Sequence, residues 1–399
     1  MREVGASPRP AVGALPRCGP KWGSRRPVQR ECGRAQKWAY DLHTEIKHRI
    51  LIQYLNPWLT ILGSSYNSLA YVDGFAGRGR YVSGEAGSPL LVLDALVARL
   101  NTHLQEEFVC HFVEAHPENY ANLEAEIARH PVSRYSRITC KLYPSTFSAA
   151  SSEIMADIRQ RRQPSFFFVD PFGYDDPSMA TLQEVLELPR AEVLVNLMFN
   201  FAHRAMNIQG NSKLTQILDS LFGSHEWINL IPLVGQERER AFMELYRNQL
   251  RRSGAKHVVR FRMGDDQIAR TLYYLIHGTK HSKGGMLMKD VMVALASPGQ
   301  RGYGGATRHI SMPLFDLQQR DLPKFLHSRY AGRTITFDDL IIDTLEDEET
   351  ATSQEKDYRA AIRELERNGA VTIQQITTTY GLDGEDEITF ALHRQSNLF

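Results

Sequence analysis

The stretch YVDGFAGRG, residues 71–79, ends an apolar run at an acidic residue and then passes through two closely spaced glycines. Gly77 and Gly79 let the backbone turn sharply and approach a ligand, because no Cβ stands in the way. Asp73 offers a carboxylate beside this turn, and helix-start residues follow only at Ser88 and Pro89. The stretch predicts a strand, a ligand-binding loop and a helix; an ordinary structural turn is the alternative.

Apolar segments alternate with helical ones after an amphipathic helix that is predicted between Trp38 and Gly63. Aromatic and aliphatic runs predict buried strands at 69–75, 108–115, 138–143, 166–172 and 192–198. The helices predicted between and after these strands cover 88–100, 119–129, 147–161 and 179–188. This alternation predicts an α/β fold with a Rossmann-like, doubly wound sheet. Two more helices within 212–252 and strands at 258–263 and 271–279 would complete it.

The second predicted strand closes with Glu114 and Ala115. Ligands of such sheets bind beyond the carboxyl ends of the strands, so the residues there are candidates for binding. The carboxylate of Glu114 would lie where it could accept both hydroxyls of a nucleoside ribose. A solvated carboxylate at the end of a strand is the other interpretation.

An ordered set of motifs gives the chain a resemblance to a known family. The motifs are YVDGFAGRG, GSPL, HFVEA, FFFVDPFG and VNLMFNFAHR, at 71–79, 87–90, 111–115, 166–173 and 195–204. Over roughly residues 37–300 they resemble the bacterial three-Cys-motif partner family, which is regarded as class I methyltransferase-like. The resemblance implies S-adenosylmethionine as cofactor and a partner protein that carries the three-cysteine motif. The implied cofactor residues are Asp73, Gly74, Phe75, Ala76, Gly77, Gly79, Glu114 and Ala115.

The fourth predicted strand runs into Asp170, Pro171 and Phe172. This segment resembles the D-P-P-Y/F motif of amino-methyltransferases, in which the aspartate and a proline carbonyl hold the target amino group. Here Phe172 stands in place of the second proline and Gly173 in place of the aromatic residue, which puts base methylation in doubt. A structural Asp-Pro turn is the alternative.

Two more polar residues, Asn196 and Arg204, come at the carboxyl end of the fifth strand, where a substrate could lie. Arg204 could clamp a phosphate or carboxylate of a substrate. The predicted catalytic set is therefore Asp170, Pro171, Phe172, Asn196 and Arg204.

Charge is distributed unevenly along the 399 residues, although the formal net charge is only +1. Residues 1–36 are rich in Arg, Pro and Gly, and we expect a disordered basic extension there. Residues 37–315 are predicted to form the methyltransferase-like domain, and 331–399 a winged-helix-like module. This module carries 6 basic and 15 acidic side chains, a balance that favours partner docking or packing on the catalytic domain over contact with phosphates.

Several other classes of protein are disfavoured. The four cysteines have no metal-ligand spacing, so no metal site is expected. The apolar runs are too short to span a membrane, and we expect a cytoplasmic protein.

The function that these observations favour is S-adenosylmethionine-dependent methyl transfer to a nucleic acid or another polar, anionic substrate. The basic segment 201–309, with 16 basic and 8 acidic side chains, would suit such a substrate. The alternatives are a non-catalytic cofactor-binding partner subunit and a nucleic-acid-binding protein without a cofactor.

Overall fold

The computed structural model describes residues 40, 42–100, 106–171, 177–208, 210–265, 270–296, 321–347, 350, 352–376 and 381–392. The predicted basic extension, residues 1–36, lies outside this part of the chain. Within it, none of the helices is long and apolar enough to cross a membrane.

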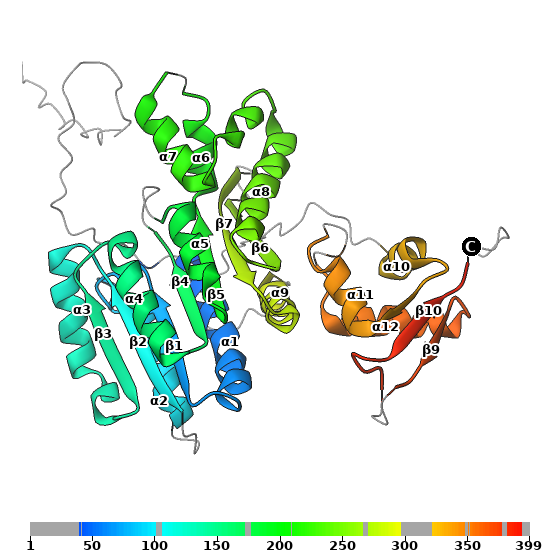
Figure 1. Cartoon of the computed structure of the whole chain (residues 1–399), viewed down its shortest axis with the longest axis horizontal. Helices are drawn as coiled ribbons and strands as arrows, with labels where there is room; N and C mark the ends of the chain where they lie inside the picture. The colour runs from blue at the N-terminus through cyan, green and yellow to red at the C-terminus, as the bar shows by residue number, and fades with distance from the viewer. Residues whose placement is uncertain are drawn as a thin grey trace, which may run out of the picture. The chain divides into compact units, whose positions relative to one another are not determined.

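A seven-stranded sheet forms the centre of the larger module (Figure 1), with the strand order β3-β2-β1-β4-β5-β7-β6. Its strands are β1 (Ser68–Asp73), β2 (Glu107–Val113), β3 (Ile138–Tyr143), β4 (Ser165–Val169), β5 (Ala191–Leu197), β6 (His257–Asp265) and β7 (Arg270–Thr279). The first five strands pair in parallel, whereas β7 lies antiparallel to both of its neighbours. The order reverses between β1 and β4, and such a switch point is where open α/β sheets bind ligands.

Helices cover both faces of this sheet. They are α1 (Leu42–Gly63), α2 (Ser88–Leu100), α3 (Pro117–Arg129), α4 (Phe147–Arg161), α5 (Met179–Glu187), α6 (Phe199–Ala205), α7 (Ser212–Phe222), α8 (Gly235–Arg252) and α9 (Ser282–Ala296). The side chains of α1, α2 and α9 pack in one apolar cluster, and those of α4, α5 and α8 in another. Phe166 and Phe168 belong to the first cluster and Phe167 to the second, because successive side chains of a strand point to opposite faces.

The predicted doubly wound α/β fold is confirmed, with small differences at the ends of elements. The first strand ends at Asp73, two residues earlier than predicted, because the carboxylate of Asp73 accepts the N–H of Phe75 and turns the chain. The fourth strand ends at Val169, directly before Asp170. The short helix α6 was not predicted, since its seven residues are too few to show a clear period.

The second module is winged-helix-like. It contains α10 (Leu322–Tyr330), β8 (Thr334–Thr336), α11 (Phe337–Thr344), α12 (Glu355–Arg367), β9 (Val371–Gln374) and β10 (Glu387–Phe390), with the sheet order β8-β10-β9. Leu326 and Tyr330 of α10 lie in its apolar core, so this core includes residues before the predicted start at 331.

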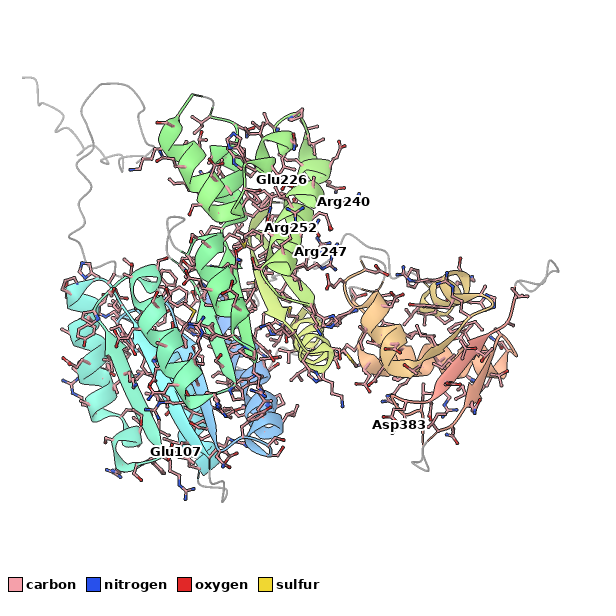
Figure 2. All side chains as sticks on the ribbon, viewed as in Figure 1. Glu107, Glu226, Arg240, Arg247, Arg252 and Asp383 are labelled. Atoms are coloured by element: carbon pink, nitrogen blue, oxygen red, sulfur yellow. The ribbon has the colours of Figure 1, made fainter. Side chains whose placement is uncertain are left out.

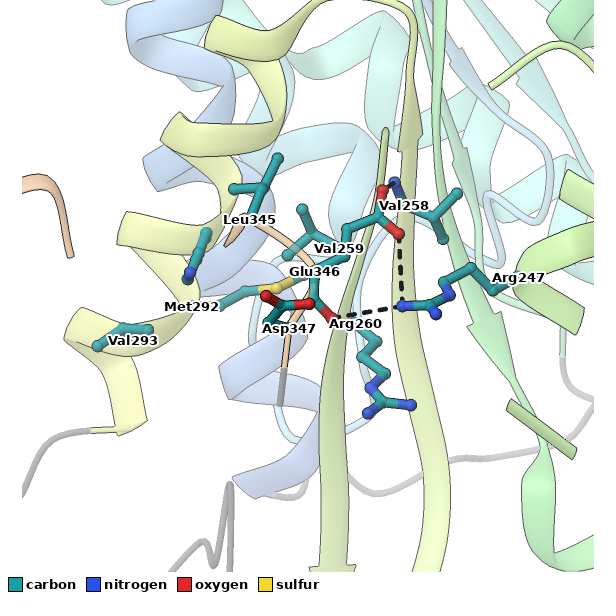
Figure 3. A pocket seen from close by; sticks show the side chains of 10 residues that line it. Arg247, Val258, Val259, Arg260, Met292, Val293, Leu345, Glu346 and Asp347 are labelled. Atoms are coloured by element: carbon teal, nitrogen blue, oxygen red, sulfur yellow. Dashed lines mark hydrogen bonds and ion pairs between the residues drawn. The ribbon is translucent and has the colours of Figure 1, made fainter. Parts of the chain in front are cut away.

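Glu346, which follows α11, makes contacts with residues of α8 and β6 (Figure 3). Its Oε1 accepts the backbone N–H of Val258 at 2.9 Å, and its Oε2 lies 2.6 Å from Arg251 and 3.4 Å from Arg247. Burial raises the pKa of Glu346 despite these donors. The side chain is only 11% exposed, so this carboxylate joins the end of α11 to the outermost strand of the large sheet.

We expect Glu346→Gln to lower the free energy of unfolding by about 1–3 kcal/mol, because both ion pairs are lost while the bond from Val258 can remain. Glu366→Gln is the matched control, since Glu366 pairs with Arg363 and both side chains are more than a third exposed. Such surface pairs contribute about 0–1 kcal/mol. Urea unfolding followed by circular dichroism measures both variants, and equal losses would contradict the special role of Glu346.

Candidate cofactor and acceptor site

The carboxylate of Asp73 is fully buried at the end of β1. Its Oδ2 accepts the hydroxyl of Ser88 at 2.6 Å and that of Tyr71 at 3.4 Å, and its Oδ1 accepts the N–H of Phe75 at 3.2 Å. Burial nevertheless raises the pKa of Asp73 to about 7. The side chain thus fixes the turn against the start of α2, and the predicted direct contact of Asp73 with a cofactor stays a prediction.

The glycine loop combines left-handed backbone with close packing. Gly77 has φ +61° and Gly79 φ +80°, values that favour glycine. A Cβ at Gly79 would lie 3.3 Å from Leu123 in α3, whereas a Cβ at Gly77 would meet no heavy atom within 4 Å. The loop is therefore packed on α3 at one glycine and open at the other.

Residues 74–76 connect this loop to the rest of the sheet. A Cβ on Gly74 would lie 3.1 Å from the ring of Phe147, which also packs against Phe75. The N–H of Ala76 donates to the carbonyl of Val113 at 2.9 Å. These contacts place the loop beside the end of β2, where Glu114 follows.

Glu114 lies close to the glycine loop. Its carboxylate accepts the N–H of His116 at 2.7 Å, and the side chain of Asn119 and the backbone of Gly77 also act to lower its pKa. Burial outweighs these effects and raises the pKa of Glu114. Ala115 beside it is exposed. The predicted cofactor residues at the ends of β1 and β2 therefore meet in the structure.

Two polar atoms next to Glu114 were missed from the sequence. Nδ1 of His116 and Oδ1 of Asn119 are buried and have no hydrogen-bond partner among the described residues. A buried polar atom without a partner is costly, so such atoms often mark a position where a ligand supplies the missing bond. The signal in the sequence is weak, because a histidine and an asparagine near the start of a helix are ordinary.

Asp170 and Asn196 lie together at the ends of β4 and β5. The amide Nδ2 of Asn196 donates to Oδ1 of Asp170 at 2.6 Å, and Nζ of Lys47 lies 2.5 Å from Oδ2. Asn196 is buried, and its Oδ1 has no partner in the described part of the chain. Lys47 comes from α1 and was not predicted as a site residue.

One aromatic ring lies beside Lys47: its ammonium is 5.5 Å from the centre of the Tyr273 ring. His48, the next residue of α1, packs in a separate group of rings with Tyr40 and Tyr81, whose centres lie 5.1–6.1 Å apart. Burial lowers the pKa of His48 to about 4, although the nearby Asp170 opposes this shift. His48 is therefore neutral at physiological pH.

The remaining predicted catalytic residues are not part of this cluster in the described structure. Pro171 is buried next to Asp170, and Phe172 lies outside the described residues. Arg204 is exposed on α6, where its Nε donates to the carbonyl of Asn200 at 3.3 Å. No group of three or more His, Cys, Asp or Glu side chains in the described part of the chain could hold a metal ion.

We expect the stability of Asp73→Asn, relative to the parent protein, to increase between about pH 5 and pH 8. An acid whose pKa is raised in the folded state stabilises the fold at low pH, and this contribution is lost as the pH rises through about 7. The variant has no carboxylate to ionise. Scanning calorimetry across this range measures the difference in melting temperature, and a difference that does not change with pH would contradict the assignment.

Comparisons with known proteins agree with a chain of two modules. A family model described as a GMT-like wHTH domain matches residues 304–375. Protein LPL1258 from Legionella pneumophila str. Philadelphia 1 is 12% identical with a TM-score of 0.36, over 61% of this chain and 86% of that chain. The delta-N METTL16 MTase domain is 11% identical with a TM-score of 0.28, over 58% of this chain and 83% of that chain.

A search of curated proteins finds no match to the chain. The fold assignment therefore rests on the strand order and on the family model. The chain combines an α/β module built on a mostly parallel seven-stranded sheet with a C-terminal winged-helix module.

Proposed function

We propose that this protein is an S-adenosylmethionine-dependent methyltransferase that acts on a nucleic acid or another polar, anionic acceptor. The observation that carries the proposal is the meeting of the glycine loop with the end of β2, where the N–H of Ala76 donates to the carbonyl of Val113, the residue before Glu114. The space beside Gly77 is open, so a ligand can approach the backbone there.

The polar groups around Glu114 suit the sugar of this cofactor. A ribose presents two hydroxyls, each a donor and an acceptor. The carboxylate of Glu114 and Oδ1 of Asn119 are acceptors, and Nδ1 of His116 accepts or donates according to its tautomer. When bound, S-adenosylmethionine supplies an electrophilic methyl group. The residues of this chain would hold the sugar and keep the loop close to the ligand.

The acceptor would be held at Asp170 and Asn196. Asp170 directly follows β4, and Asn196 is the residue before the last in β5. These two strands pair in parallel, with Val169 opposite Val195. Because β4 also pairs in parallel with β1, both residues lie at the same edge of the sheet as the glycine loop. The cofactor and the acceptor would therefore meet at the switch point.

A three-Cys-motif protein is the partner that we propose from the sequence resemblance. Docking of a protein is also favoured by the pairing of cations within the winged-helix module. Arg359 bonds to Glu355, and Arg363 bonds to Glu366, so these two arginines of α12 are already partly neutralised. Direct phosphate contacts by this helix would require that both pairs break.

Nucleic-acid binding through the winged helix is the second candidate function, and the match to the GMT-like wHTH model favours it. A cofactor-binding subunit without catalytic activity is a third. All three candidate functions are compatible with the C-terminal module. Only methyl transfer requires Asp170 to act on an acceptor.

We expect Glu114→Ala to weaken the binding of S-adenosylhomocysteine about 30- to 150-fold, because two buried hydrogen bonds to the ribose, together on the order of 2–3 kcal/mol, are lost. Glu107→Ala is the matched control, since Glu107 opens the same strand and is exposed at the opposite edge of the sheet (Figure 2). Titration calorimetry gives both affinities. No binding by the parent protein would overturn the proposed function.

We expect Asp170→Asn to reduce methyl transfer by roughly a hundredfold or more while S-adenosylhomocysteine affinity stays within a few-fold, because the charge acts mainly in the transition state. Asp157→Asn removes a carboxylate that pairs with Lys141 away from this cluster and serves as control. Labelled-methyl transfer into a cell extract and a melting curve are measured for each protein. Unchanged transfer by a folded Asp170→Asn variant would exclude Asp170 as a catalytic residue.

A further inference from the structure

We propose that the methyl acceptor at Asp170 is a hydroxyl oxygen, as in a sugar or a phenol, and that Lys47 is the residue that selects it over an aromatic amine. This inference rests on the proposed methyl transfer and narrows its substrate class. It is carried by the contacts of Asp170, Asn196 and Lys47.

The carboxylate of Asp170 is already engaged on both oxygens. Oδ2 lies 2.5 Å from the ammonium of Lys47 and Oδ1 accepts Nδ2 of Asn196 at 2.6 Å. Both charged side chains are mostly buried, with 11% of Lys47 and 14% of Asp170 exposed. An amino group that docks on this carboxylate would have to displace or share these donors.

The groups that remain available complement a hydroxyl. Lys47 has further N–H donors, and Oδ1 of Asn196 is a buried acceptor with no partner in the described part of the chain. A hydroxyl can donate its single proton to Asn196 and accept a bond from Lys47 with one lone pair, which leaves a second lone pair for the reaction. An aromatic amine needs its one lone pair for the reaction and cannot also accept from an ammonium.

The charge of Lys47 favours the same class of acceptor. Methylation of an amine builds positive charge on nitrogen, which a neighbouring ammonium repels, whereas a hydroxyl oxygen gains negative charge as it loses its proton. The acceptor oxygen forms the new bond to the methyl carbon as the methyl–sulfur bond breaks and its electron pair stays on sulfur. The hydroxyl proton passes to water, because the amide of Asn196 holds it only by a hydrogen bond and both oxygens of Asp170 already have donors.

An aromatic side chain beside Lys47 would suit an acceptor that carries a ring. The centre of the Tyr273 ring lies 5.5 Å from the ammonium. His48 is neutral at physiological pH, since burial lowers its pKa to about 4. It therefore adds no second positive charge next to the carboxylate.

The chemistry of the acceptor can be tested on the full-length protein. The protein is incubated with S-adenosylmethionine that carries a trideuterated methyl group and with a complete cell extract, which is then hydrolysed and analysed by mass spectrometry. The label should be found on hydroxyl oxygen. A label on nitrogen or carbon would overturn this inference and leave the proposed methyl transfer intact, whereas no incorporation would overturn both.

The role of Lys47 is tested with variants of the Lys47–Asp170 pair. Lys47→Met should reduce transfer a hundredfold or more, while calorimetry shows S-adenosylhomocysteine affinity within a few-fold of the parent. Lys141→Met is the matched control, because it removes a lysine that lies 2.9 Å from Asp157 and should change transfer less than a few-fold. A loss of transfer as large in this control would overturn the assignment.

A double variant tests the ion pair itself. Lys47→Met alone leaves the buried charge of Asp170 without its partner, and adding Asp170→Asn removes that charge. We expect the double variant to recover the melting temperature that Lys47→Met loses. A double variant that melts as low as Lys47→Met would overturn the assignment of the pair.

Discussion

The buried carboxylate of Asp73 is the constraint on which the cofactor end of the site depends. A carboxylate without exposed surface is tolerated only when donors surround it, and here Ser88, Tyr71 and the backbone of Phe75 supply them. These bonds join the end of β1 to the start of α2 and determine where the intervening glycine loop can lie. The loop in turn bonds to the end of β2, beside Glu114, through the N–H of Ala76, so the geometry of the candidate cofactor residues depends on this internal cluster.

The parts of the fold that were predictable from the sequence are those specified by local pattern. β1, β2 and β4 are mainly apolar runs that end at or directly before Asp73, Glu114 and Asp170, and the helices that follow strands carry periods or caps. Thr146 and Ser178 show this well, because their side chains accept backbone N–H groups at the starts of α4 and α5. The glycine loop and Glu114 were recognisable for the same reason, since their meaning depends only on the end of a strand.

Lys47 was missed because its contact joins distant parts of the chain. It is 123 positions away from Asp170, and no periodicity in α1 distinguishes it from a solvated lysine. Arg238 is similar: it is buried and bonds to Asn207 at 2.7 Å and to the carbonyl of Ile231 at 2.5 Å. The burial of Asp73 could not be predicted either. An aspartate that contacts a ligand and one that stabilises a turn occur in the same sequence pattern.

The position of Glu346 has a consequence for the behaviour of the protein in a crowded solution. β6 is the last strand of the large sheet, and an outermost strand can pair with strands of other molecules through its unused backbone groups. The side chain of Glu346 accepts one such N–H, that of Val258, and so occupies a backbone donor of this strand. Loss of the C-terminal module would expose this donor to strands of other molecules, and we expect it to favour aggregation even where the residues of the candidate site remain in place.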